Sequence, residues 1–241
     1  RTYDNTTGGG STGRAGGSHA GSGGEPTRAV AATYGDMQEP VTPGGGGGAL
    51  DASGTGGNGS GTMHVVVTGT ITYTGRFAAD GAPASGPAGG GAGGSVWIIA
   101  PICNATGHIS ASGGDGSNHG TASGGGGGGR ISLDAPDVLI TGTITAFGGA
   151  GGYGGPGGED GTIYYPYEIV WNGLGDATLW SNTANWNPPI LPRPWNDTYI
   201  VLESGVNAVQ DIDVHVKSLF LGDTVGSQSL TTQDSALTFD S

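Results

Sequence analysis

Short segments of alternating apolar residues recur along the chain, at 62–67, 95–98, 130–133 and 162–165, and glycine runs precede most of them. Strands of this length with apolar residues at every second position have one buried face. One unit is too small to bury that face, but stacked units form a continuous apolar column tied by backbone ladders about 4.8 Å apart. The pattern therefore predicts an all-β chain folded as a β-solenoid, or parallel β-helix.

A second phrase, in which Thr-Gly leads into an apolar residue, lies between these segments at 68–72, 106–111 and 141–146. A degenerate copy of the same phrase lies at 48–52. Aligning the isoleucines of the three good copies gives a repeat of 35 to 38 residues, in the range of stacked-repeat proteins. Each unit is then a strand, a glycine-rich turn, a second strand and a short turn.

Glycine is the commonest residue, with 55 copies, and proline adds 13. Such a share is typical of low-complexity chains, but the regular apolar spacing argues against a linker. Glycine can turn sharply at a solenoid corner, or it can extend as a left-handed helix of the polyproline II type against a neighbouring backbone. Because ordering glycine costs more backbone entropy than ordering any other residue, we expect the tracts to pack against the next repeat or against another subunit.

The chain divides into three regions by composition. Residues 1–45 hold few apolar residues and are expected to form a glycine-rich arm or cap, and residues 46–168 carry the solenoid repeats. Residues 169–241 contain less glycine and most of the tryptophan, followed by short Val- and Leu-rich segments. We interpret this region as a junction and a second solenoid segment, which we expect to continue beyond residue 241.

Two roles are open for the tryptophans of the last region. They can plug the junction between two solenoid segments, or they can stack on glycans. The tyrosines Tyr153, Tyr164, Tyr165 and Tyr167 would extend the same aromatic patch. The candidate residues are Trp171, Trp180, Trp186 and Trp195.

The spacing of these motifs resembles that of large secreted bacterial surface proteins, including autotransporter-like proteins. The resemblance rests on Trp-Asn-Gly at 171–173, Ala-Asn-Trp at 184–186 and Ile-Val-Leu at 200–202, and on glycine phrases such as Gly-Gly-Ser-His at 16–19. It implies right-handed parallel β-helix repeats and an extracellular, adhesive or fibrous role. It supplies no catalytic residues.

Charge is sparse and acidic, with 7 Lys and Arg against 20 Asp and Glu and a net charge of −13. No basic stripe is available for nucleic acid or an anionic membrane, and no apolar run is long enough to span a bilayer. The single cysteine, Cys103, excludes a disulfide within the chain. It is expected to be a small buried hydrophobe, the alternative being a disulfide between subunits.

Few residues suggest metal or catalytic chemistry. The five histidines lack paired ligand spacing, and no cofactor motif occurs. Asp211 and Asp213 alternate onto one strand face and are the Ca²⁺ candidates. Clustered Asp pairs, which a polysaccharide lyase or hydrolase on a β-helix would need, are absent from the sequence. Four Asn-x-Ser/Thr sequons are possible glycosylation sites in a secreted protein: Asn5, Asn58, Asn104 and Asn196.

The function expected from the sequence is that of an extracellular, non-enzymatic structural protein. Its subunits would stack into a cell-surface fibre, because solenoid ends carry unpaired strand edges, and the expected partner is another copy of the chain. The alternatives are an adhesin stalk or glycan-binding module and, less favoured, a polysaccharide lyase or hydrolase.

Overall fold

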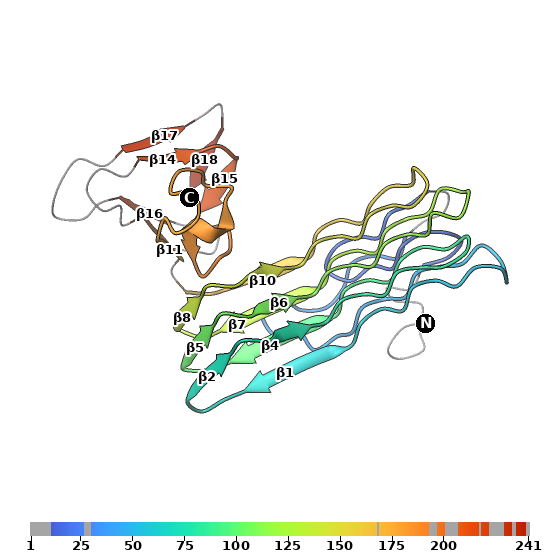
Figure 1. Ribbon diagram of the computed structural model, residues 1–241, viewed down its shortest axis with the longest axis horizontal. Coiled ribbons are helices and arrows are strands. Elements are labelled where there is room, and N and C mark those ends of the chain that lie inside the picture. Colours follow the sequence, from blue (N-terminus) through green and yellow to red (C-terminus); the bar gives the residue numbers. More distant parts are fainter. Residues whose placement is uncertain are drawn as a thin grey trace.

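The computed structural model describes residues 11–26, 30–167, 169–192, 197–200, 207–216, 218–221, 229–232 and 235–239. Parallel strands stack into a β-solenoid of about three turns (Figure 1), which confirms the predicted fold class. Each turn supplies three strands, and β10 begins a fourth. The strands are β1 (Thr62–Val66), β2 (Thr70–Tyr73), β3 (Arg76–Ala78), β4 (Ser95–Ile99), β5 (Ile102–Ala105), β6 (His108–Ser110), β7 (Arg130–Asp134), β8 (Asp137–Ile140), β9 (Ile144–Thr145) and β10 (Thr162–Tyr164).

Three parallel sheets form the walls of the column, in the orders β1-β4-β7-β10, β2-β5-β8 and β3-β6-β9. Their registers repeat every 32 to 35 residues, as in Thr62 against Ser95 and Ser95 against Arg130. Inward side chains from the three walls meet in one apolar core, whose second layer includes Val96 and Ile109. The four alternating segments read from the sequence are the strands β1, β4, β7 and β10.

The second repeated phrase is out of register in its first copy. The partner of 106–110 is not 68–72 but 74–78, because Arg76 pairs with His108 and Phe77 pairs with Ile109. Phenylalanine at the position where later copies have isoleucine concealed the match, and residues 70–73 instead form the corner strand β2. The degenerate copy at 48–52 forms no strand and lies in a turn.

The glycine tracts are not turns but long extended segments that continue each repeat away from the strands (Figure 1). The six glycines 124–129 show the geometry. Their N–H groups donate in rotation to three neighbouring segments, at Arg14, Pro156 and Gly114 and then at Gly17, Glu159 and Ala111. A partner that changes with each residue and returns after three is the signature of a polyproline II helix, which has three residues per turn. The second of the two sequence interpretations of glycine therefore holds.

These segments stack in three layers. One outer layer consists of 79–84, 111–117 and 146–152, and the central layer of 54–61, 88–94, 123–129 and 155–161. The other outer layer is formed by 11–18, 21–26 and 43–48. Residues expected to form an arm or cap therefore include one complete face of this glycine lattice, and 123–129 contacts six neighbouring segments.

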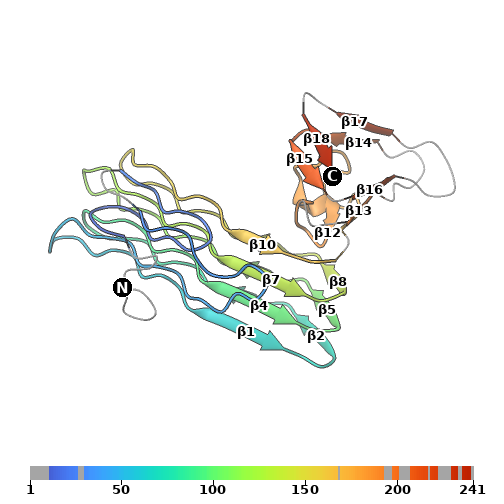
Figure 2. The same ribbon diagram turned by 180° about the vertical axis from the view of Figure 1, so that it is seen from behind.

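Residues from 169 onward form a second group of parallel strands at one end of the column (Figures 1 and 2). β11, β13 and β16 pair in parallel, as do β14 with β17 and β15 with β18, and β11 also pairs with β12 in antiparallel fashion. The offset is 29 residues between β11 and β13 and 21 to 23 residues in the three later parallel pairs. The elements are β11 (Ile169–Trp171), a 3-10 turn η1 (Thr183–Asn185), β12 (Trp186–Asn187), β13 (Asp197–Ile200), β14 (Asn207–Gln210), β15 (Val214–Val216), β16 (Ser218–Leu221), β17 (Ser229–Thr232) and β18 (Leu237–Phe239).

Candidate functional site: the open end of the solenoid

The apolar core is covered unequally at the two ends of the column. In the first turn, the inward side chains are only partly buried: Met63, Val65, Ile71, Tyr73 and Phe77. Their counterparts in the second turn are 0–5% exposed: Val96, Ile98, Cys103, Ala105 and Ile109. Within the described residues, no further layer of side chains therefore covers the first turn.

No described strand covers the backbone at this end either. Strands β1, β2 and β3 are each the last strand of their sheet, and no other described strand pairs with their outer edges. Both views place β1 and β2 along one border of the ribbon (Figures 1 and 2). We call these three edges, with the five inward side chains above, the open end.

At the opposite end of the column the C-terminal module packs on the inward side chains of β8 and β9, although the outer edges of β8, β9 and β10 likewise pair with no described strand. Val138, Ile140 and Ile144 of the third turn are 3–6% exposed and belong to one apolar cluster with Ile169 and Trp186 of the module. The Asn187 side chain donates from Nδ2 to the carbonyl oxygen of Val138 at 2.7 Å. A pocket of about 240 Å³ remains beside this contact, between Leu139 and Leu174.

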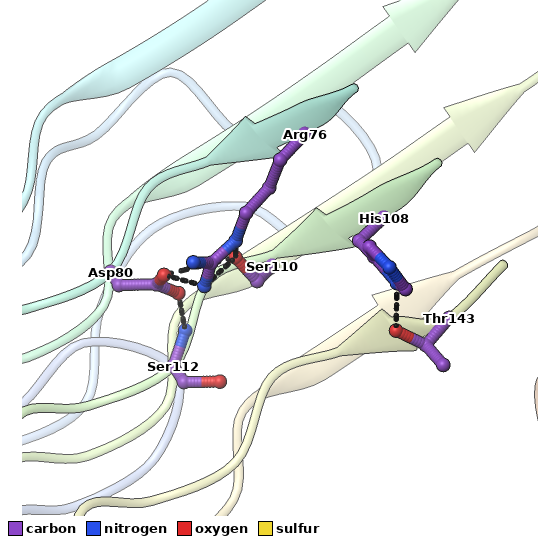
Figure 3. A network of polar contacts seen from close by, with 6 residues as sticks. All are labelled: Arg76, Asp80, His108, Ser110, Ser112 and Thr143. Carbon is purple, nitrogen blue, oxygen red and sulfur yellow. Dashed lines mark hydrogen bonds and ion pairs between the residues drawn. The ribbon is translucent and has the colours of Figure 1, made fainter. Parts of the chain in front are cut away.

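The only charged side chain on the first three strands is turned away from the open end. Arg76 of β3 forms an ion pair with Asp80, and its Nε donates to Ser110 Oγ of the second turn at 3.1 Å (Figure 3). Ser110 Oγ donates to Asp80 Oδ2 at 3.0 Å, and the other oxygen of Asp80 accepts the Ser112 N–H. The guanidinium charge is thereby satisfied within the subunit.

A second polar pair lies further along the same wall. His108 Nδ1 lies 2.8 Å from Thr143 Oγ1, one turn on (Figure 3). Ser110 Oγ is hydrogen-bonded to Arg76 and Asp80, whereas His108 is paired with Thr143. The serine, histidine and aspartate here therefore do not form a nucleophilic triad, which requires the base to reach the nucleophile.

Burial also controls the protonation of Tyr73, which belongs to the open end, and of Cys103, which lies behind it in the second turn. Cys103 is fully buried, and burial raises the pKa of its thiol to about 11. Burial likewise raises the pKa of the Tyr73 hydroxyl well above its usual value. Both groups are neutral at physiological pH, and a thiol without solvent access is placed for packing rather than for a disulfide between subunits.

The tryptophans lie in the core of the C-terminal module. Trp180 and Trp186 are fully buried and Trp171 is 3% exposed. Trp186 meets the other two rings edge to face, with ring centroids 4.9 and 5.3 Å apart, and its Nε1 donates to the carbonyl oxygen of Trp180. These three rings present no free face to solvent. Trp195 lies outside the described residues.

The Ca²⁺ candidates are engaged in separate hydrogen bonds. Asp211 accepts from the backbone N–H and the hydroxyl of Ser181, and Asp213 accepts from the Ala236 N–H. Within the described ranges, no three His, Cys, Asp or Glu side chains come together as a metal would require. The same part of the chain has no helix with the length and apolarity needed to cross a membrane.

Two of the four sequons fall on described residues. Asn58 is exposed on the segment 54–61, and Asn104 is half-buried on β5. Asn5 and Asn196 lie outside the described residues. Asn58 borders the open end, because the segment 54–61 leads directly into β1.

Sequence reasoning did not single out the residues of the open end, although a signal was available. The chain carries 20 acidic residues, yet residues 52–79 contain no Asp, Glu, Lys or Pro. Charge and proline are the devices by which natural proteins protect strand edges. The edges of β1 and β2 carry neither, and the one charge on β3, that of Arg76, is paired with Asp80.

Comparisons with protein-family models, with curated proteins and with solved structures gave no match. The structure identifies the chain at the level of architecture, as a parallel β-solenoid whose turns extend into a glycine lattice.

Proposed function

We propose that this protein is an extracellular, non-enzymatic structural protein, a rigid subunit that assembles with further copies of itself at a cell surface. The observation that carries the proposal is the open end, where three unpaired strand edges surround a partly exposed core. Uncovered edges of this kind pair with other chains. The resemblance to secreted bacterial surface proteins supports the same location and role.

The glycine lattice supports a structural role on energetic grounds. Ordering glycine is costly, and here the cost is offset by backbone hydrogen bonds in all directions. Every N–H and every C=O of residues 124–129 has a backbone partner on another segment. An arrangement so uniformly bonded is suited to stiffness, and it devotes a large part of the chain to a solid body.

The test is direct imaging and mass measurement of the purified full chain. We expect light scattering to give a molar mass that rises with concentration above that of one chain, and negative-stain electron microscopy to show particles larger than one subunit. Particles that stay at the monomer mass of 23.5 kDa under all conditions would contradict the proposal. Release of sugar products from pectin or related glycans would contradict its non-enzymatic part.

A further inference from the structure

We infer that the open end is an isologous interface, at which a second copy of this chain docks with its own open end about a two-fold axis. This inference rests on the proposed self-assembly and specifies its surface and symmetry. In such a contact the same patch serves both partners. The edge strands of the two copies then run antiparallel, and the two partly exposed cores cover each other.

The symmetry follows from the unequal ends of the column. Head-to-tail stacking would need the third turn of one copy to receive the first turn of the next. The C-terminal module already packs on that turn, since Val138 and Ile140 are nearly buried and Asn187 bonds to the Val138 carbonyl. A two-fold contact avoids the module and covers the open end of both copies at once.

The backbone of the open end is directed for pairing. Ser95 N–H donates to the Gly61 carbonyl, and Val67 N–H donates to the Ile99 carbonyl, so Gly61 and Val67 face β4. Because polar groups alternate along a strand, Thr62, His64 and Val66 direct their N–H and C=O groups to the outer edge. On β2, the Tyr73 carbonyl accepts from Thr106 N–H and therefore faces the second turn. By the same alternation, Thr70 and Thr72 direct their N–H and C=O groups to the outer edge.

Charge favours a second copy over other occupants. Two copies of a protein with net charge −13 repel each other, and a contact between them must avoid the acidic residues. Residues 52–79, which include all three edge strands, hold no carboxylate, and Arg76 is neutralised by Asp80 of its own subunit. The open end is therefore a face on which this acidic chain can meet itself without opposing carboxylates.

The experiment compares lysine substitutions at matched positions of one ladder. Thr72 of β2 and Leu139 of β8 occupy equivalent positions two turns apart, both with exposed side chains. The test variant combines Thr72→Lys with Val66→Lys, whose side chain is 62% exposed, and the control is Leu139→Lys. In a two-fold contact, each new lysine of one copy lies close to a new lysine of the other copy. The repulsion between these like charges opposes pairing. Since these side chains are exposed, the fold is expected to survive, and calorimetry checks that it does.

We expect light scattering to give about twice 23.5 kDa for the wild type and the Leu139→Lys control, and the monomer mass for the double variant. A double variant that pairs as strongly as the wild type would overturn the inference while leaving self-assembly through another surface intact. A monomeric wild type would overturn both proposals.

Hydrogen exchange of the wild type supplies a second readout that needs no substitution. On dilution from the paired to the monomeric state, the amides of His64, Val66 and Thr72 should lose protection, because the partner strand leaves. Amides of β7 should be unaffected, since that strand lies between β4 and β10. Equal protection of the edge amides at both concentrations would overturn the inference.

Discussion

At the residue scale, the absent side chain of glycine is the determinant of the lattice. A Cβ atom built on any of the residues 124–129 would lie 1.8–2.1 Å from a backbone carbonyl oxygen of another segment. Backbone on both sides leaves nothing that can move aside. Larger side chains occur where a segment faces solvent, as at Asn58, and the buried lattice positions that are not glycine include the small residues Ala88 and Ala92.

The substitution Gly126→Ala should therefore destabilise the protein by about 3 kcal/mol or more, at or above the upper end for overpacking, because the new Cβ would meet the Gly91 carbonyl oxygen at 2.0 Å. The matched control is Gly69→Ala, where nothing lies within 4 Å of the added atom and a change within about 1 kcal/mol is expected. Differential scanning calorimetry measures both. Equal melting temperatures for the two variants would refute the close-packed lattice.

His19 introduces a pH dependence at the seam between lattice and strands. It is fully buried, with Nδ1 2.8 Å from the Gly93 carbonyl oxygen and Nε2 3.0 Å from Thr42 Oγ1. Burial lowers its pKa from 6.5 to about 4, and the charge of Arg130 acts in the same direction. Because the folded state binds the proton less tightly than the unfolded state, stability is greatest above pH 6.5 and falls as the pH drops toward 4.

The expected loss between these two pH values is about 3 kcal/mol. Denaturant titrations monitored by tryptophan fluorescence at a series of pH values measure it. The variant His19→Gln lacks the titrating group and should show a flatter dependence over this interval. An unchanged slope in that variant would assign the acid sensitivity to other groups.

At the element scale, the turn between β11 and β12 is held by one carboxylate and two side-chain amides. Asp176 accepts from the side chains of Asn182 and Asn185 and from the N–H groups of Leu179 and Thr178. These hydrogen bonds, those of the two asparagines foremost, hold the pKa of Asp176 far below its usual range. The turn delivers Trp180 and Trp186 to the core of the C-terminal module.

Replacing Asp176 with alanine should lower the melting temperature of the module and shift tryptophan emission to the red, because the turn loses its acceptor and the rings gain solvent. The sign with pH follows from the depressed pKa: the contribution is present above the unfolded value of 3.8 and is lost as the pH falls below it. The control is Asp137→Asn, at an exposed position of β8. It removes a surface carboxylate but leaves the hydrogen bonds of this turn unchanged. An effect of equal size in both variants would refute the role of Asp176.

Elements whose apolar residues alternate were predictable, and those defined by long-range backbone contacts were not. The strands β1, β4, β7 and β10 follow from alternation alone, because one face of each meets the core. The strand register predicted from the repeat was wrong where Phe77 stands in place of isoleucine. Residues 11–26 and 30–48 have no periodic pattern of apolar residues. Their glycine segments are held by backbone hydrogen bonds to other segments, which the sequence pattern does not reveal. The buried positions of Trp180 and Trp186 likewise depend on contacts that spacing does not encode.

At the scale of the whole molecule, the strand column and the glycine lattice are two halves of the same turns. Each repeat leaves the column through one outer layer, reverses, and returns through the central layer, as 111–117 and 123–129 do. Disturbing one half therefore disturbs the register of the other. The central segments 88–94 and 123–129 are hydrogen-bonded to segments on both sides.

Native-state hydrogen exchange should accordingly show the slowest amides in 88–94 and 123–129, as slow as those of β4 and β7, because their opening requires the global transition. Outer-layer segments such as 146–152 should exchange faster. Mass spectrometry of peptides covering these ranges measures the order. Rapid exchange across 123–129 would contradict the bonding described above.

The extended left-handed conformation of the lattice has one more consequence, which concerns how the protein looks in solution. Polyproline II is also a major conformer of unfolded chains, so the far-ultraviolet circular dichroism of the lattice should resemble that of a disordered polypeptide. The spectrum should nevertheless change sharply at a defined temperature, as a random coil does not. A routine spectroscopic screen would discard this protein as unfolded, although its glycines are among the most tightly constrained residues in the molecule.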